Sequence, residues 1–414
     1  MRQQQLRHLL ALSFGFGLVV LASAASASAQ NVVDGTGCPE LDVPAVQAAV
    51  DQGGEVILRG HFSFDAEPTV PTALVGLATV LVSRAVAISG VQDEDGEMTS
   101  IEAGRIPFYV EAPGARVTIQ RLTFVRPNRT AMFVYAVSGL VVASCRIEGV
   151  EPSDHTGTAI AINTSGGLPT PTNPGRPENV SGMLLILNND IDVSGGTALD
   201  DKLGVNTFSV GVPGSEVDIF ISGNNIRNNT EPAIGIRRIV GRAYIERNVV
   251  TTGPVVGQAP RPQAIRVVNT GSYLIAHNSI DCGWASAEAE GIGVFTQFVE
   301  WPMERAIVVD NNVTMSPPEG TVFTEFSAGI GVYGQANGNS VLNNRIRGQA
   351  RAALYVASYQ GGIPDNNAFV LNRFDDFEPS VADVFVADGV MNTLIVGPGT
   401  VEDHGIGTVI VPLK

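Results

Sequence analysis

Three arginines are the residues of this sequence best suited to do chemistry. Arg237 and Arg238 are adjacent, and Arg266 follows about one sequence repeat later. A guanidinium group binds a carboxylate through two parallel hydrogen bonds, so a cluster of three would recognise an anionic ligand. The alternative is that these arginines form surface salt bridges with neighbouring acidic side chains, which contribute little free energy.

A second group of candidate residues is acidic. Asp154 lies on one predicted loop, and Asp200 and Asp201 lie on the next. Because Ca²⁺ takes several oxygen ligands, these carboxylates are the candidate metal site, and Ca²⁺ is the one cofactor that the sequence suggests. A solvated acidic surface is the alternative.

The charge balance limits the possible partners. The chain has 25 Lys and Arg residues against 41 Asp and Glu residues, and a formal net charge of −16. A surface this acidic repels nucleic acid and anionic lipid, so we expect no nucleic-acid partner. The three cysteines are Cys38, Cys145 and Cys282, and an odd number excludes a fully paired disulfide framework within one chain.

The N-terminal region has the pattern of a secretory signal peptide. Arg2 and Arg7 accompany an apolar run from Leu9 to Leu21, and small residues typical of a cleavage site follow at Ala27 to Ala29. We expect residues 1–29 to be removed and the protein to be secreted, into the periplasm or the medium. No second apolar run is long enough to cross a bilayer, so we expect no membrane span in the mature chain.

One short pattern recurs nine times along the chain. It consists of an apolar residue, two others, a ladder residue, one other and a second apolar residue, as in Ile221-Asn224-Ile226. Leu122 and Cys145 occupy the ladder position in the first two copies. The other ladder residues are all asparagine: Asn189, Asn224, Asn248, Asn278, Asn311, Asn344 and Asn372.

A second pattern, apolar-x-apolar, alternates with the first, as in Ile160-Ile162, Val210-Val212 and Ile234-Ile236. Several neighbouring copies are about 24 residues apart. A unit of this length cannot bury its inner face alone, but stacked units form a continuous core. The sequence therefore predicts an all-β fold, a right-handed parallel β-helix solenoid of about ten coils.

The same patterns predict how the solenoid is organised. Each ladder asparagine is expected to point inward at a corner, where its amide bonds to turn backbone and to the asparagines above and below. Residues 43–50 are expected to form a helix that caps the first open edge. We therefore divide the chain into a signal peptide at 1–29, an N-terminal segment with the capping helix at 30–60, the β-helix at 61–400 and a C-terminal cap at 401–414.

The helix-Gly-Gly-strand opening and the asparagine-bearing coils resemble the right-handed parallel β-helix superfamily. This superfamily includes pectate lyases, polygalacturonases, alginate epimerases and many uncharacterised secreted proteins. The segment from Arg261 to Arg266 is similar to the Arg-x-Pro-x-x-Arg signature of pectate lyases, but its proline stands one place early. In the superfamily's lyases an arginine is the base, so the resemblance implies a catalytic role for Arg266.

The outward positions of the apolar-x-apolar strands suggest where a ligand would lie. The middle of this sheet is predicted to be nearly bare, with Gly235, Gly293 and Gly331 around Arg266. Such glycines indicate either close approach of a ligand or small residues packed under loops. With the arginines Arg237 and Arg238, nearby aromatic residues are the candidate substrate-binding residues: Phe295, Tyr333 and Tyr355.

Two classes of function remain at this point. The first is a secreted β-helix that binds an extended polysaccharide or another cell-surface polymer, or acts as a surface or matrix interaction protein. The second is a polysaccharide lyase or epimerase that uses Arg266 as its base. Aromatic residues beside a bare groove, without a complete acid and base set, favour binding.

Overall fold

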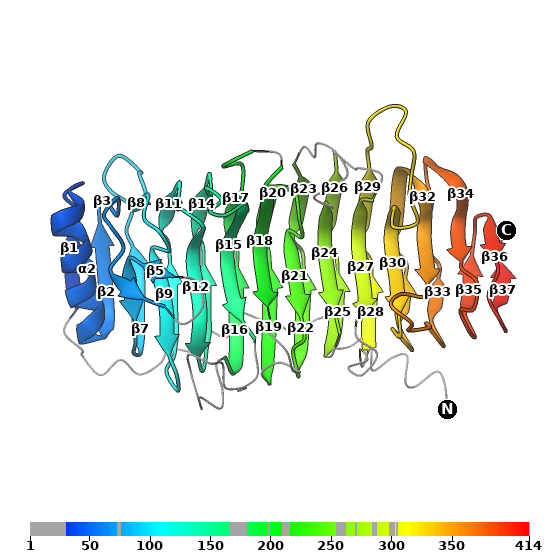
Figure 1. Ribbon diagram of the computed structural model, residues 1–414, viewed down its shortest axis with the longest axis horizontal. Helices are drawn as coiled ribbons and strands as arrows, with labels where there is room; N and C mark the ends of the chain where they lie inside the picture. The colour runs from blue at the N-terminus through cyan, green and yellow to red at the C-terminus, as the bar shows by residue number, and fades with distance from the viewer. Residues whose placement is uncertain are drawn as a thin grey trace.

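The structure is a computed structural model, and it describes residues 30–72, 76–164, 180–197, 199–208, 216–253, 262–269, 271–283, 288–297, 303 and 305–413. The predicted signal peptide lies outside these residues. Short strands stack along one long axis, and the helix α2 (Pro39–Gln52) lies at the N-terminal end (Figure 1). The chain is a right-handed parallel β-helix, as the repeat predicted.

Sheet A forms one side of the solenoid and has fourteen parallel strands among the described residues. In spatial order they are β1 (Asn31–Asp34), β2 (Gly54–Arg59), β7 (Val86–Gly90), β10 (Val117–Gln120), β13 (Leu140–Ala143), β16 (Gly182–Leu187), β19 (Val217–Ser222), β22 (Arg242–Glu246), β25 (Ser272–Ala276), β28 (Arg305–Val309), β31 (Ser340–Leu342), β33 (Ala368–Val370), β35 (Leu394–Gly397) and β37 (Val409–Pro412).

The second side, face B, follows a corner after most strands of sheet A, from β2 to β31. Its parallel strands are β3 (His61–Ser63), β8 (Ser100–Glu102), β11 (Thr123–Val125), β14 (Arg146–Glu148), β17 (Asp190–Asp192), β20 (Asn225–Asn229), β23 (Val249–Thr252), β26 (Ser279–Cys282), β29 (Asn312–Met315) and the first part of β32 (Arg345–Ala357).

The third side, face C, is continuous with face B through the long strand β32. Its parallel strands are β6 (Val80–Val82), β9 (Phe108–Ala112), β12 (Thr130–Val137), β15 (Thr156–Asn163), β18 (Asp201–Phe208), β21 (Ile234–Arg237), β24 (Gln263–Val268), β27 (Glu290–Thr296), β30 (Ala328–Gly334), the last part of β32, β34 (Phe377–Val386) and β36 (Val401–Asp403). A short antiparallel pair, β4 (Val70–Pro71) and β5 (Leu77–Ala78), lies beside it in the sequence.

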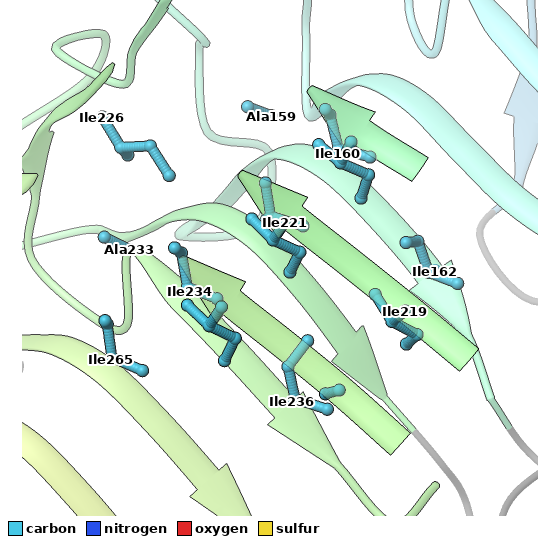
Figure 2. Packing of buried hydrophobic residues seen from close by; sticks show 14 of the residues in the cluster. Ala159, Ile160, Ile162, Ile219, Ile221, Ile226, Ala233, Ile234, Ile236 and Ile265 are labelled. Carbon is cyan, nitrogen blue, oxygen red and sulfur yellow. The ribbon is translucent and has the colours of Figure 1, made fainter. Parts of the chain in front are cut away.

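One apolar cluster fills the inside of the solenoid along its length. Figure 2 shows Ile219 and Ile221 of β19 in the same cluster as Ile234 and Ile236 of β21. All four are fully buried because period-2 alternation turns every second side chain inward. Burial of apolar surface between stacked coils is the main favourable contribution to the free energy of folding.

The asparagine ladder is confirmed. All seven predicted asparagines are buried, and each amide nitrogen from Asn189 to Asn344 donates to the Oδ1 atom of the next ladder asparagine at 2.9 to 3.0 Å. The same Oδ1 atom also accepts the backbone N–H of the preceding ladder residue, as between Asn224 and Asn248 at 3.0 Å. The ladder therefore satisfies buried backbone groups at the corner between sheet A and face B.

The residue before each ladder position has a left-handed backbone. The φ angles of this set lie between 51° and 70°, although only one member is glycine: Arg121, Ser144, Asn188, Gly223, Arg247, His277, Asp310, Asn343 and Leu371. A left-handed residue with a side chain costs about 1 to 2 kcal/mol. We infer that the hydrogen bonds of the ladder offset this cost and fix the corner.

One predicted pair of inward positions was wrong. In the register of face C, Val205 pairs with Ile160 and Ile234, and Thr207 is the next inward residue. The prediction had placed Val210 and Val212 there, which lie outside the described residues. The apolar pattern did not include Thr207 because threonine is polar. Its hydroxyl can be buried because it accepts a hydrogen bond from the Arg237 backbone N–H at 2.7 Å.

The predicted capping helix is confirmed as α2, which packs against β1, β2, β3 and β6. Its buried Asp42 carboxylate accepts the Thr36 backbone N–H and hydroxyl and the Ser63 backbone N–H, all at 2.8 Å. This side chain therefore ties the helix to the first coil. At the opposite end, β37 continues sheet A as an exposed edge strand.

Candidate functional site

The outer side of face C is not the bare groove that the sequence predicted. Tyr333 and Phe295 are buried, and each ring folds back over the glycine two residues before it. A Cβ atom on Gly331 would lie 2.2 Å from Cε2 of Tyr333, and one on Gly293 would lie 2.5 Å from Cε2 of Phe295. The lack of a side chain at these glycines therefore leaves room for the rings of Phe295 and Tyr333. Aromatic residues cover glycines in other sheets in the same way.

The covering rings continue into a stack along the axis of the solenoid. The Phe295 and Tyr333 ring centroids are 4.5 Å apart with nearly parallel planes, and the Tyr355 and Phe385 centroids are 5.1 Å apart. Tyr333 and Tyr355 link the two pairs at 5.7 Å. Since all four rings are buried, they stabilise this face in the conformation observed. The substrate-binding role of Phe295, Tyr333 and Tyr355 stays a prediction.

Arg266 lies within the same row, between Gly235 and Gly293 of the neighbouring strands. Its Cζ atom is 4.8 Å from the centroid of the Phe295 ring, so the guanidinium group makes a cation–π contact. Its Nε atom is buried and has no hydrogen-bond partner within the described parts of the chain. The Nε donor of Arg266 is therefore held against the protein without an acceptor.

The structure brings Arg237 close to Arg266. Arg237 ends β21, two residues beyond Gly235, which pairs with Arg266. Burial first, and then the charge of Arg266, lower the pKa of Arg237 to about 10, and the charge of Arg238 contributes in the same direction. The predicted arginine cluster thus brings like charges together, and the opposite charge of Glu231 acts on Arg237 as well. Burial also withdraws Arg237 partly from water.

A buried acid beside this cluster was missed by sequence reasoning. Glu290, the first residue of β27, is fully buried on the outer side of face C, and its Oε2 atom accepts a hydrogen bond from Nε2 of Gln263. Burial and the Glu290 carboxylate raise the pKa of Tyr333 well above its ordinary value. The one available signal was a single acidic residue at the start of an otherwise apolar strand.

The three acidic candidates, Asp154, Asp200 and Asp201, lie in different surroundings. The Asp154 carboxylate is largely exposed, and one of its oxygens is 4.0 Å from Nη1 of Arg129. The Asp200 carboxylate accepts the Thr197 backbone N–H at 2.7 Å and lies 3.0 Å from Nδ1 of His155. Burial first, and then the neighbouring Asp200, raise the pKa of Asp201.

Within the described residues, no three His, Cys, Asp or Glu side chains are grouped closely enough to hold a metal ion. Calcium binding by Asp154, Asp200 and Asp201 therefore stays a prediction without geometric support. The segments at 165–178 and 254–261, the second of which includes Arg261, lie outside the described residues.

Comparisons with known proteins concern the fold. No protein-family model and no curated protein matches the sequence. The chain is similar to the A-module of the mannuronan C-5 epimerase AlgE6 from Azotobacter vinelandii, with 13% identity and a TM-score of 0.42, over 93% of this chain and 97% of that one.

The A-module of the mannuronan C-5 epimerase AlgE4 from the same organism is 12% identical with a TM-score of 0.34, over 94% of this chain and 96% of that one. The Dettilon tailspike protein gp208 is 11% identical with a TM-score of 0.37, over 92% of this chain and 68% of that one. At these identities the likeness is one of fold. By the pairing of its own strands, the chain is a right-handed parallel β-helix protein whose face C combines arginines with buried aromatic rings.

Proposed function

We propose that this protein binds an extended acidic polysaccharide along the outer side of face C, through Arg237, Arg238 and Arg266. The observation that supports the proposal is the partly buried pair of like charges formed by Arg237 and Arg266. Holding such charges together costs free energy. A carboxylate placed between them would offset that cost through hydrogen bonds to the guanidinium groups.

The arrangement of the arginines suits a linear ligand. Arg237 and Arg266 belong to neighbouring coils, whose strands are about 4.8 Å apart along the axis. A polymer that follows the axis would therefore meet one arginine after another. Because the rest of the protein is strongly acidic, such binding would be local and sensitive to salt.

A second candidate function is a polysaccharide lyase or epimerase with Arg266 as the base. The observation that favours it is the buried pair of Glu290 and Tyr333 beside the arginines. A proton abstraction next to a carboxylate needs a base, an acid and a group that holds the carboxylate. Since Tyr333 is fully buried, this chemistry would also require the face to open.

The test of the first proposal is a binding panel of acidic and neutral polysaccharides, which includes mannuronan, the polymer named for two of the similar structures. Binding is measured by calorimetry for the wild type, Arg237→Ala and Arg266→Ala. The matched control is Arg146→Ala, an exposed arginine on face B. We expect each face C variant to bind an acidic polymer about tenfold more weakly, an effect that shrinks at high salt.

Unchanged affinity after removal of Arg237, Arg238 and Arg266 together would overturn the proposal. The second candidate is tested on the same samples, by ultraviolet absorbance for unsaturated ends and by NMR for inversion at the carbon that bears the carboxylate. Product formed by the wild type and lost in Arg266→Lys, with binding retained, would make the protein an enzyme.

We also propose that the mature protein is exported. The N-terminal pattern of residues 1–29 supports this proposal. N-terminal sequencing of protein from the exported fraction is expected to begin at Gln30. A mature protein that begins at Met1 inside the cell would contradict it.

A further inference from the structure

The outer side of sheet A presents a continuous apolar surface. Parallel register aligns one outward residue per strand, from β13 to β28, and all of these side chains are half-buried: Val141, Leu185, Phe220, Tyr244, Leu274 and Ile307. None of them contributes to the inner core. They therefore form a row of large apolar side chains on the outside of the solenoid.

A second row, two residues further along each strand, continues the surface to the C-terminal end. From β28 to β37 its members are aliphatic: Val309, Leu342, Val370, Val396 and Val411. Val411 is 42% exposed and its row-one neighbour Val409 is 54% exposed. We call the two rows together the sheet A stripe.

The other two sides of the solenoid differ from sheet A. The outer side of face B is polar and ion-paired, as between Arg227 and both Asp190 and Asp192. The outer side of face C is covered by its own aromatic clusters. Among the described parts of the chain, sheet A is thus the side with a long apolar surface in solvent, and such a surface usually marks an interaction site.

The chemistry of the stripe favours a protein partner over a carbohydrate or a membrane. Phe220 and Tyr244 stack on each other, with ring centroids 4.5 Å apart and planes 8° apart, so one face of each ring is covered by the other and is not available for a sugar ring. The other members are mainly aliphatic. The net charge of −16 disfavours an anionic lipid surface.

The distribution of charge also allows a second copy of this chain to approach through sheet A more easily than through another side. Within the two rows from β13 to β37, Glu246 is the only acidic residue in the part of the chain that the structure describes. The neighbouring Asp218 is paired with Arg242 at 2.8 Å. Two molecules that repel each other elsewhere can therefore approach through this side.

The size of the stripe is sufficient for a dimer. Ten strands at about 4.8 Å and a width of about 13 Å per strand give on the order of 600 Å² per copy. Two copies would bury about 1,200 Å², which is at the lower end of specific interfaces. We propose that two copies pack their A sheets face to face about a two-fold axis, so that each stripe covers the other.

The proposal is independent of the arginine site and is tested by oligomeric state. Sedimentation velocity over a range of concentrations is expected to show a dimer for the wild type. Leu274→Glu, in the middle of the stripe, is expected to weaken dimerisation at least tenfold. The matched control is Val249→Glu, which places the same charge on an exposed apolar side chain of face B and should leave the dimer intact.

Circular dichroism tests whether each variant is folded. Leu342→Glu, on β31 two strands further along the stripe, replaces Leu274→Glu if that variant does not fold. A wild type that stays monomeric at its highest soluble concentration would overturn the proposal. A dimer that survives both stripe variants would overturn it as well, because the contact would then lie elsewhere.

Discussion

Asn224 gives two hydrogen bonds to one atom of Asn248. Its amide nitrogen and its backbone N–H both donate to the Oδ1 atom of Asn248, each at 3.0 Å. The Oδ1 atom of Asn224 in turn accepts the same two groups of Asn189. One side chain thus links three successive coils at a corner where no water is available to replace it.

We expect Asn224→Ala to lower the free energy of unfolding by about 1 to 3 kcal/mol, because it leaves the buried N–H groups of Asn189 without an acceptor. The measurement is denaturant unfolding. Asn225→Ala is the control, since this adjacent side chain is exposed and its amide nitrogen bonds to the partly exposed Asp190. Equal losses for the two variants would contradict a structural ladder.

The attachment of the N-terminal cap to the first coil should depend on Asp42. Asp42→Ala removes the acceptor of three hydrogen bonds between α2, Thr36 and Ser63, so we expect a loss of about 2 to 3 kcal/mol and faster proteolysis of the first coil. Limited proteolysis with mass spectrometry locates the opened segment. Asp51→Ala, at an exposed acid of the same helix, should have little effect.

The space above Gly331 is occupied by Tyr333, so Gly331→Ala should destabilise the protein by about 1 to 3 kcal/mol. The same change should cost much less in a Tyr333→Ala background, and a double-mutant cycle measures this coupling. Gly283→Ala is the control, because its nearest neighbour would lie 3.6 Å from the new Cβ atom. Additive losses would mean that the ring does not fold over Gly331.

Burial raises the pKa of the Cys145 thiol from 9.0 to about 12. The folded protein therefore holds this proton more tightly than the unfolded chain does. The contribution of the protonated Cys145 thiol to the free energy of unfolding is complete below pH 9. It is lost as the pH rises from 9 towards 12, at about 1.4 kcal/mol per pH unit. The free energy of unfolding of Cys145→Ala should decline less steeply in this window, and parallel pH profiles would refute a buried thiol.

Much of the fold follows from the sequence because the inside of the solenoid repeats one local rule. An apolar residue at every second position and an asparagine at each corner specify which side chains point inward, and the buried Asn248, Ile226 and Ile265 show that this reading is right. The rule failed in the coil of β18, where the inward positions are Val205 and Thr207 and not Val210 and Val212. The Thr207 hydroxyl is satisfied there by the backbone of the next coil.

The outside of the solenoid was decided by the tertiary structure. Glycines at 293 and 331 have the same appearance in the sequence whether a ligand or a neighbouring ring lies above them. Only the folded structure places Phe295 and Tyr333 there. The closeness of the like charges of Arg237 and Arg266, the burial of Glu290 and the alignment of Tyr244 with Leu274 likewise depend on stacking. Inward positions are specified by the period within one strand, whereas outward neighbours come from different coils separated by insertions of unequal length, so their contacts are determined only when the coils stack.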